Sequence, residues 1–167
     1  EIVVGKGKKI LFEKSLPLGV SRMQGLIEPK DPHKKEDLRK LRQHIRREVG
    51  PLVESIAALD PAGCVAVGGT ARALGRLVLR SEGEGSEALR GLLLERDTLA
   101  DLAQDLSRAT HAERLERPGV SSRRADLLPF GAEILACVLG LFGFPALMIC
   151  DWGLREGVLL DLIESGG

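Results

Sequence analysis

The segment that most constrains the fold is the apolar run from Leu127 to Cys150, LLPFGAEILACVLGLFGFPALMIC. It approaches the roughly 20 residues that a membrane-spanning helix needs. Three residues argue against such a helix, because Pro129 and Pro145 cannot take part in helical hydrogen bonding and Glu133 places a carboxylate inside the run. We therefore predict a buried helix that ends near Gly143, then a turn, then a short buried strand over residues 146–150.

The length and charge of the chain restrict its class further. With 167 residues, the chain is long enough for one sizeable α/β domain, and we predict that residues 1–167 form a single domain. Lys+Arg and Asp+Glu both number 24, so no overall field favours nucleic acid or an anionic membrane, and neither partner is expected. Any anion site must therefore be local.

Cysteine usage and the start of the chain bear on the cellular compartment. Cys64, Cys137 and Cys150 are odd in number and lie in apolar segments, which favours buried thiols in a reducing compartment over disulfides or a zinc site. The chain does not open on the basic and apolar regions of a secretory signal. We therefore expect a cytoplasmic protein.

Apolar periodicity predicts an alternation of strands and helices. The expected elements are a β-hairpin over residues 1–6 and 9–16, an amphipathic helix over 32–59 bent at Gly50-Pro51, a strand within 63–69, helices over 70–79 and 92–106, a short helix at 110–116, the helix ending near 143, the strand 146–150 and a last helix over 154–164. Residues 80–87 are predicted to be a polar loop. This order predicts an α/β fold with a mixed sheet, in which parallel strands and an antiparallel hairpin are flanked by helices. It is the order of a ribonuclease-H-like half whose first strand is missing.

The segment VAVGGTARALG, Val65 to Gly75, indicates an anion site. Two glycines after a buried strand let the backbone approach a ligand closely, and the helix N-terminus that follows offers N–H groups and a positive dipole end. Gly68, Gly69, Thr70 and Arg72 are the candidate phosphate-binding residues of this turn. The structural alternative is an ordinary strand-to-helix turn, which also uses glycine and threonine.

Three further turns are predicted to lie on the same face of the sheet, namely LPLGVSRM, SSRRADLLPFG and CDWGLREG. Ligands of open α/β sheets bind beyond the carboxyl ends of the parallel strands, and two of the four turns follow such ends. Arginine suits phosphate because its planar fork donates two hydrogen bonds, so Arg22, Arg124 and Arg155 are added as candidates. A solvated or ion-paired surface role is the alternative for each arginine taken singly.

Four segments together resemble a known family. SLPLGVSRM, VAVGGTARALG, RRADLLPFGAEIL and DWGLREGVLLDLI, in this order over nearly the whole chain, are similar to the second domain of the exopolyphosphatase and guanosine pentaphosphate phosphohydrolase family. The resemblance implies the actin-like ATPase superfamily and its ribonuclease-H-like fold. It also implies release of the terminal phosphate of inorganic polyphosphate or guanosine pentaphosphate, with Mg²⁺ or a similar divalent metal, in a cleft between two domains.

The resemblance assigns roles and also shows what is absent. Glu1 resembles the glutamate that follows a phosphate loop and takes part in metal and phosphate handling, while the loop itself and the first domain with its general-base glutamate are missing. Gly68, Gly69 and Thr70 match a turn that faces the nucleotide, and Arg22 and Arg124 match motifs that line the cleft. We therefore expect a fragment that contains no catalytic base and is inactive alone, with the N-terminal domain as its partner.

Several alternatives stay open at this point. Trp152 departs from the family pattern, which has a small residue between Asp151 and Gly153. A non-catalytic nucleotide- or polyphosphate-binding module, or a relative of sugar and acetate kinases, would use the same turns. The sequence does not separate polyphosphate from guanosine pentaphosphate. An apolar face exposed by truncation is expected to favour self-association, as in a homodimer.

Overall fold

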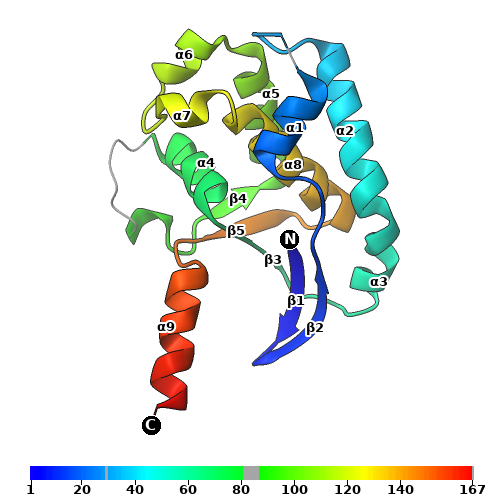
Figure 1. The fold of residues 1–167 in the computed structure, drawn as a ribbon, viewed down its shortest axis with the longest axis vertical. Helices are drawn as coiled ribbons and strands as arrows, with labels where there is room; N and C mark the ends of the chain where they lie inside the picture. The colour runs from blue at the N-terminus through cyan, green and yellow to red at the C-terminus, as the bar shows by residue number, and fades with distance from the viewer. Residues whose placement is uncertain (29, 81–86, 167) are drawn as a thin grey trace.

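The structure is a computed structural model that describes residues 1–28, 30–80 and 87–166. Helices surround a small sheet in the main body, and a β-hairpin and the last helix project from one side of it (Figure 1). The elements in chain order are β1 (Ile2–Lys6), β2 (Lys9–Lys14), α1 (Val20–Ile27), α2 (Lys35–Val49), the 3-10 turn η1 (Gly50–Leu52), α3 (Val53–Ala57), β3 (Cys64–Val67), α4 (Gly69–Leu79), the 3-10 turn η2 (Glu87–Leu89), β4 (Leu93–Glu95), α5 (Arg96–Arg108), α6 (His111–Leu115), α7 (Ser122–Ala125), α8 (Leu128–Phe142), β5 (Ala146–Cys150) and α9 (Leu154–Ser165).

The strands form two sheets. β1 pairs with β2 as the predicted antiparallel hairpin, and its turn contains Gly7 at φ +59°. In the second sheet β5 is central, with β3 parallel to it and β4 antiparallel to it. Within the described residues the hairpin does not pair with this second sheet. The mixed α/β architecture predicted from the order of elements is therefore present, with the hairpin as a separate sheet.

The apolar run that opened the sequence analysis forms the predicted helix, turn and strand. α8 ends at Phe142, where Gly143 adopts φ +74°, and β5 begins at Ala146. Other parts of the protein cover most of both elements, and their fully buried apolar side chains include Leu128, Phe130, Leu139, Leu147 and Ile149. Across the described ranges, none of the helices combines the length and the apolar character required to cross a membrane.

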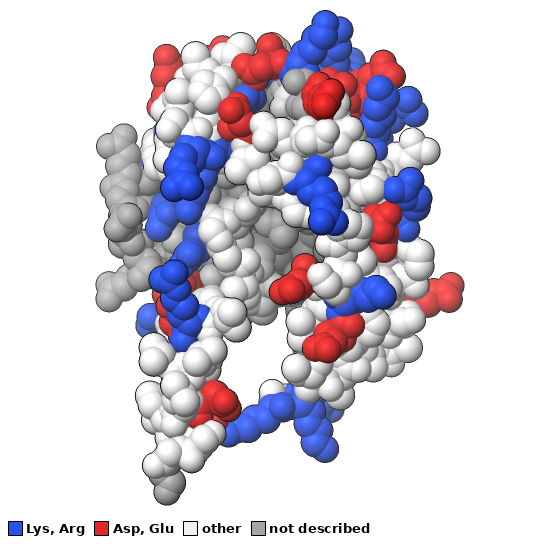
Figure 2. All heavy atoms as spheres, in the orientation of Figure 1, with Lys and Arg blue, Asp and Glu red and all other residues white. Residues whose placement is uncertain are grey.

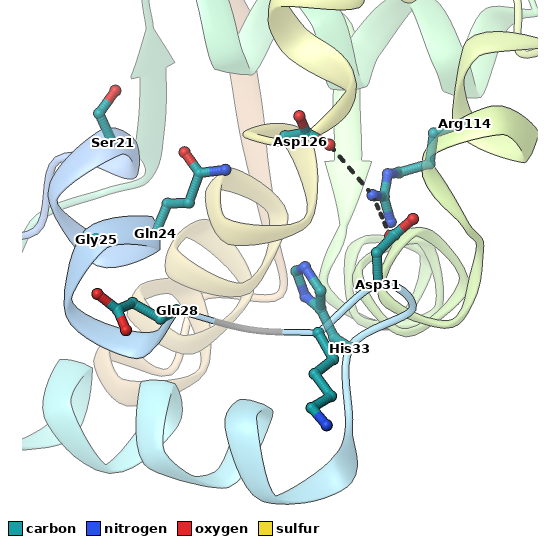
Figure 3. Close-up of a pocket in the computed structure, with 9 residues that line it drawn as sticks. Ser21, Gln24, Gly25, Glu28, Asp31, His33, Arg114 and Asp126 are labelled. Carbon is teal, nitrogen blue, oxygen red and sulfur yellow. Dashed lines mark hydrogen bonds and ion pairs between the residues drawn. The ribbon is translucent and has the colours of Figure 1, made fainter.

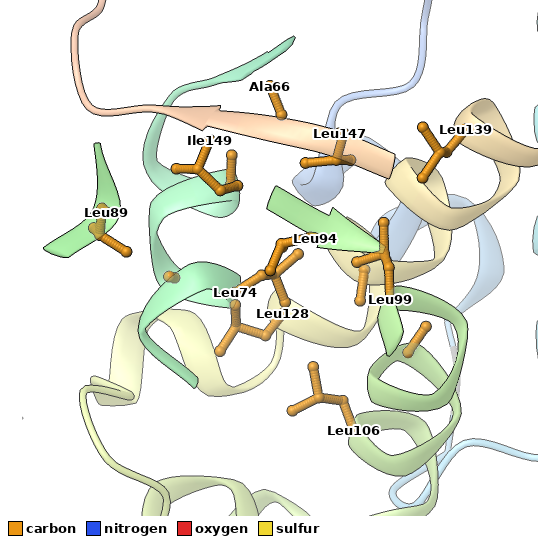
Figure 4. Close-up of a cluster of buried hydrophobic side chains, with 14 residues drawn as sticks. Ala66, Leu74, Leu89, Leu94, Leu99, Leu106, Leu128, Leu139, Leu147 and Ile149 are labelled. Atoms are coloured by element: carbon orange, nitrogen blue, oxygen red, sulfur yellow. The ribbon is translucent and has the colours of Figure 1, made fainter. Parts of the chain in front are cut away.

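Two apolar clusters form the core on either side of α8. One cluster lies between α4, α5, α8 and the second sheet and includes Leu74, Leu99 and Ile149 (Figure 4). The other joins α1, α2 and α8 through Met23, Ile45 and neighbouring side chains. Full burial of one such side chain stabilises the fold by about 1.5–3 kcal/mol, so α8 is the helix on which the other layers depend.

One buried carboxylate lies in this core helix. Glu133 of α8 is 1% exposed, and both of its oxygens accept hydrogen bonds of 2.7 Å from the guanidinium of Arg42 on α2. The same hydrogen bonds, outweighing burial, raise the pKa of Arg42. The residue that argued against a membrane helix thus joins two helices of a protein core.

Some predicted elements differ from the structure. The helix predicted from Leu92 is wrong at its start, because residues 93–95 form strand β4 against β5 and the helix begins only at Arg96. An apolar run next to a helix carries no local sign of a strand partner so distant in sequence. α1 lies where only a turn was predicted. Most of the predicted loop at 80–87 falls outside the described residues.

The remaining predictions agree with the structure or stay untested. The bend at Gly50-Pro51 is confirmed, since a 3-10 turn separates α2 from α3 there. The short helix predicted at 110–116 is present as α6, which begins with a capping box between Thr110 and Glu113. The division into one domain and the self-association stay predictions. α9 exposes apolar side chains, among them Leu154, Val158, Leu159, Leu162 and Ile163.

Candidate functional site

The candidate site begins where two parallel strands end side by side. Val67, the last residue of β3, lies opposite Cys150, the last residue of β5. The turns that follow both strands therefore emerge at one edge of the sheet, as predicted. In the first turn Gly68 has φ +107° and ψ −178°, a conformation that is essentially restricted to glycine. This conformation allows α4 to begin directly at Gly69.

Three helices meet at this edge by their first turns. A β-carbon on Gly131 would lie 2.2 Å from Cγ2 of Thr70 and 3.5 Å from Cγ1 of Val20. Val20 is the first residue of α1, Thr70 the second of α4, and Gly131 lies in the first turn of α8. Only a residue without a side chain at position 131 allows these three N-termini to approach so closely.

The helices α1 and α4 begin at residues that are exposed or half-buried, whereas the first turn of α8 is buried and contains Pro129, which has no N–H group. None of the N-cap residues, which are Gly19, Gly68 and Leu127, provides a side-chain hydrogen bond to its helix. The first N–H groups of a helix have no partner within the helix, and the aligned peptide dipoles place about half a positive charge there. The two accessible ends, those of α1 and α4, form a local positive site in a chain of zero net charge.

Two of the predicted arginines lie at this site. A β-carbon on Gly69 would lie 3.3 Å from Nη2 of Arg124, so the half-buried guanidinium of Arg124 covers the start of α4. Nη1 of Arg72, also half-buried, donates a 3.2 Å hydrogen bond to the carbonyl oxygen of Asp151. Arg72 thereby joins the two turns that follow β3 and β5. Gly68, Gly69, Thr70, Arg72 and Arg124 are thus brought together as predicted.

The carboxylates near this site are already engaged. The Asp151 side chain is 7% exposed and pairs with Arg90 at 3.5 Å. Glu156 accepts a 2.6 Å hydrogen bond from the backbone N–H of Gly153 and so caps α9. That bond, with the backbone N–H of Glu156 and the charges of Arg72 and Arg155, lowers the pKa of Glu156. Both groups act as structural anions and do not face a ligand as unpaired bases.

The other two predicted arginines lie on the surface. Arg22 on α1 and Arg155 on α9 are exposed, and neither forms an ion pair with any residue in the described ranges. Arg22 is two residues from Val20 and so lies close to the meeting point of the helices, while Arg155 lies in the first turn of α9. Figure 2 shows Lys and Arg side chains gathered in a column over α4 and the β5–α9 connection.

Glu1, the predicted metal ligand, is exposed at the start of the hairpin. The described part of the chain contains no group of three or more His, Cys, Asp or Glu residues that could hold a metal ion. These residues alone therefore do not fit a metal cage made of protein ligands. Mg²⁺ in phosphate sites typically needs only one or two carboxylates, because phosphate and water supply the remaining oxygens.

A separate cavity of about 450 Å³ lies between α1, α6 and the α1–α2 connection (Figure 3). At its wall, buried Arg114 donates to the carbonyl oxygens of Leu106 and Ala109 and, at 2.6 Å, to the carboxylate of Asp31. Asp126 lies 3.6 Å from the same guanidinium. None of the predicted site residues lines this cavity. We assign this network to holding the connection against the end of α5.

The three cysteines are half-buried and free. Burial raises the pKa of the Cys64 thiol, and burial together with the charge of Glu133 raises the pKa of Cys137 to about 11. Neither thiol is therefore activated as a nucleophile, because reactivity requires the thiolate.

Comparison with known proteins identifies the family. Residues 1–166 match the Ppx/GppA phosphatase family. The chain belongs to this family. The resemblance noted in the four sequence segments is therefore confirmed over the whole chain.

Individual members support the assignment. The chain is 32% identical to Exopolyphosphatase 1 of Mycobacterium tuberculosis over 90% of its own length and 44% of that protein. It is 22% identical to the guanosine-5'-triphosphate,3'-diphosphate pyrophosphatase of Vibrio parahaemolyticus over 99% of its length and 32% of that protein. Among solved structures, the Aquifex aeolicus Ppx/GppA family member superimposes with a TM-score of 0.91 at 25% identity, covering 99% of this chain and 53% of that one.

These comparisons also fix the extent of the match. The chain spans about half the length, or less, of the curated relatives that it matches. The high TM-score confirms the predicted actin-like fold class for this half.

Three features of the site were not predicted from the sequence. Helix α1 with Val20, the pairing of Arg90 with Asp151 and the packing of Thr70 on Gly131 all depend on contacts between distant segments. A signal existed only for the third feature, since Gly131 interrupts an otherwise bulky helical run and so marks a close approach.

Proposed function

We propose that this chain forms the phosphate-binding half of a phosphohydrolase that releases terminal phosphate from inorganic polyphosphate or guanosine pentaphosphate. The supporting observation is the meeting of three helix N-termini, capped by no side chain, beside Arg124 and Arg72. The names of the matched relatives, an exopolyphosphatase and a pyrophosphatase of guanosine-5'-triphosphate,3'-diphosphate, supply the two substrate classes. A cytoplasmic location is part of the same proposal.

In this proposal the chain binds and orients the terminal phosphates. Backbone N–H groups of Gly69 and Thr70 would donate to phosphate oxygens, and the fork of Arg124 would donate two further hydrogen bonds. Fixed donors of this kind stabilise the charge that develops on the transferred phosphoryl oxygens without reorganisation. They also hold the phosphorus in line for attack by water.

The catalytic base is proposed to come from elsewhere. Asp151 is paired with Arg90 and Glu156 caps α9, so neither is positioned to activate water. The base would then belong to the part of the relatives' length that this chain does not span. It follows that the chain alone should bind phosphates and release none.

Magnesium is proposed as the cofactor, with Glu1 as its carboxylate on this chain. A hard divalent ion would neutralise charge on the leaving phosphate when bound. Because Glu1 is a single ligand, the affinity of the chain for Mg²⁺ alone should be weak and should rise when polyphosphate is present.

The test measures binding and phosphate release together. Inorganic tripolyphosphate is titrated into the chain by calorimetry, and Arg124→Met should weaken binding about 10-fold, the loss of a charge-assisted hydrogen bond of about 1.5 kcal/mol. Arg123→Met is the matched control, because Arg123 is the exposed neighbour on α7 and should change affinity less than about twofold. Equal effects of the two variants, or no binding, would refute the site.

Phosphate release decides between an enzyme part and a binding module. Release from polyphosphate or guanosine pentaphosphate with Mg²⁺ is compared between the chain and any longer product of the same gene. Release by the longer product alone supports the divided site and identifies the substrate. Tight binding without release by either one would favour a non-catalytic binding module.

A further inference from the structure

Helix α7 carries Arg124 to the phosphate site, although this helix is only one turn long. It spans Ser122–Ala125, and a single helical turn is not stable by itself in water. Its N-cap residue, Ser121, provides no side-chain hydrogen bond, and Ala125 is its only buried residue. The position of α7 must therefore come mainly from contacts at its ends.

The Arg124 side chain does not fix its own position. Within the described ranges it takes part in no ion pair and no side-chain hydrogen bond. Its guanidinium nevertheless covers the start of α4, where a β-carbon on Gly69 would lie 3.3 Å from Nη2. A long, flexible side chain reaches a site reproducibly only when the backbone that carries it is held by neighbouring groups.

Asp126, the C-cap residue of α7, attaches this helix to the body of the protein. Its Oδ1 accepts a 2.6 Å hydrogen bond from Nδ1 of His111 at the start of α6 and lies 3.6 Å from Nη2 of Arg114. Arg114 is 1% exposed, and its Nη1 donates to the carbonyl oxygens of Leu106 and Ala109 at the end of α5. Figure 3 shows the side chains of Asp126 and Arg114 pointing toward each other. The carboxylate of Asp126 thus ties α7 to α5 and α6.

The groups that hold Asp126 are themselves held. Nη2 of Arg114 also donates to Asp31 at 2.6 Å, and the Asp31 carboxylate accepts a 2.6 Å hydrogen bond from the backbone N–H of His111. Two carboxylates therefore share one buried guanidinium, and both are also bonded to the same histidine. Hydrogen bonds connected in this way strengthen one another, so the network offers α7 a rigid attachment.

We propose that Asp126 is a positioning residue for phosphate binding, which acts through Arg124 by fixing the end of α7 to His111 and Arg114. The backbone N–H of Leu127 donates to the carbonyl oxygen of Arg124 at 2.9 Å, so Asp126 lies within the same turn as Arg124. The inference rests on the proposed phosphate site. A carboxylate repels phosphate, so any support that Asp126 gives to phosphate binding is indirect.

Loss of charge and loss of position predict opposite effects for Asp126→Ala. Removal of a negative charge alone would strengthen the binding of inorganic tripolyphosphate, because the chain becomes more positive. Loss of the attachment should instead weaken binding about 3- to 5-fold in calorimetry, less than the roughly 10-fold expected for Arg124→Met. Glu36→Ala is the control for charge, because Glu36 pairs with Lys40 on the surface of α2 and its removal should not weaken binding.

A double-mutant cycle separates positioning from a general loss of structure. If Asp126 acts through Arg124, Asp126→Ala should change the affinity less than about 1.5-fold in the Arg124→Met background. A residue that acts on the fold as a whole would weaken binding by the same factor in both backgrounds.

Two further variants test the attachment itself. Asp126→Asn should retain most of the affinity, because its amide oxygen can still accept from His111. His111→Ala should weaken binding as Asp126→Ala does, and it tests the attachment from its other end if Asp126→Ala does not fold. Thermal unfolding shows which variants are folded at the temperature of the titration.

The outcomes keep this inference apart from the function on which it rests. Weakening by Asp126→Ala and His111→Ala that disappears in the Arg124→Met background supports the positioning role. Unchanged or stronger binding in these variants, or equal weakening in both backgrounds, overturns that role and leaves the phosphate site intact. Failure of the wild-type chain to bind, or no effect of Arg124→Met, overturns the phosphate site and the positioning role together.

Discussion

The side chain of Thr70 fills the space that a side chain on Gly131 would need: a β-carbon there would lie 2.2 Å from Cγ2 of Thr70. Real β-carbons do not approach other atoms so closely, so the Thr70 side chain or one of the two helices must shift if position 131 carries a side chain. The absence of a side chain at position 131 therefore allows Thr70 to pack directly on the first turn of α8.

Gly131→Ala is predicted to destabilise the fold and to weaken phosphate binding at the same time. Forcing a methyl group into a closely packed contact costs about 1–3 kcal/mol. Gly140→Ala is the matched control on the same helix, because a β-carbon there meets no atom within 4 Å. Alanine at that position should stabilise by about 0.5–1 kcal/mol. Urea unfolding measures both, and equal effects would contradict the packing argument.

Alanine substitutions at the two glycines after β3 are predicted to change the folding free energy by different amounts and for different reasons. Gly68→Ala should cost about 1–3 kcal/mol of folding free energy, because φ +107° is strained for any side chain although the space is open. Gly69→Ala should cost less than about 0.5 kcal/mol, since its β-carbon meets only the flexible end of Arg124 at 3.3 Å.

For the same two variants, tripolyphosphate binding should be measured alongside stability. Displacement of the Arg124 guanidinium in Gly69→Ala should weaken tripolyphosphate binding about 10-fold, the value for one charge-assisted hydrogen bond. Thermal unfolding and calorimetry measure the two quantities. A stability loss in Gly69→Ala as large as that in Gly68→Ala would show that Arg124 is not free to move.

Loss of the ion pair between Arg42 and Glu133 is predicted to destabilise the fold, because Glu133 is buried. Arg42→Met leaves the Glu133 carboxylate without its two hydrogen bonds and should cost about 3 kcal/mol. Arg46→Met, on an exposed face of the same helix, should stay within about 0.5 kcal/mol of the wild type. Arg42→Met combined with Glu133→Leu should recover much of the loss in urea unfolding, and no recovery would refute the explanation by an unpaired charge.

The stability of the fold is predicted to fall in acid partly through Asp31. Burial raises the pKa of Asp31, but hydrogen bonds from the His111 backbone and from Arg114 outweigh it and hold the pKa below the ordinary 3.8. A lowered carboxyl pKa adds stability at pH values above 3.8 and loses it as pH falls through the folded-state value. The difference in melting temperature between wild type and Asp31→Asn should therefore shrink as pH falls below about 4. A difference that is constant with pH would exclude this contribution.

Much of the site could be predicted from local sequence, because its residues lie at the ends of strands. Gly68, Gly69 and Asp151 come directly after two apolar strands, and the carboxyl ends of parallel strands share one edge of a sheet. The segments that carry Arg72 and Arg124 could be assigned to this face for the same reason. Periodicity and turn residues, both local properties, contain this information.

The rest depends on contacts between distant segments. β4 is short and exists because β5, far along the chain, pairs with it. In α1 only Met23 is fully buried, so the helix has little apolar periodicity to reveal it. The contacts of Val20 and Thr70 with Gly131 join three separate segments, and a single sequence shows only that a glycine interrupts α8.

The helix N-termini at Gly131 have a consequence for how the site responds to its environment. Backbone N–H groups and guanidinium groups do not titrate between pH 5 and pH 9, so the donors of this site stay the same across that range. A dependence of binding on pH would then report the ligand, whose terminal phosphate gains its second charge near pH 6. Because the dipoles belong to the main chain, exchange of one side chain can weaken this positive region but cannot remove it.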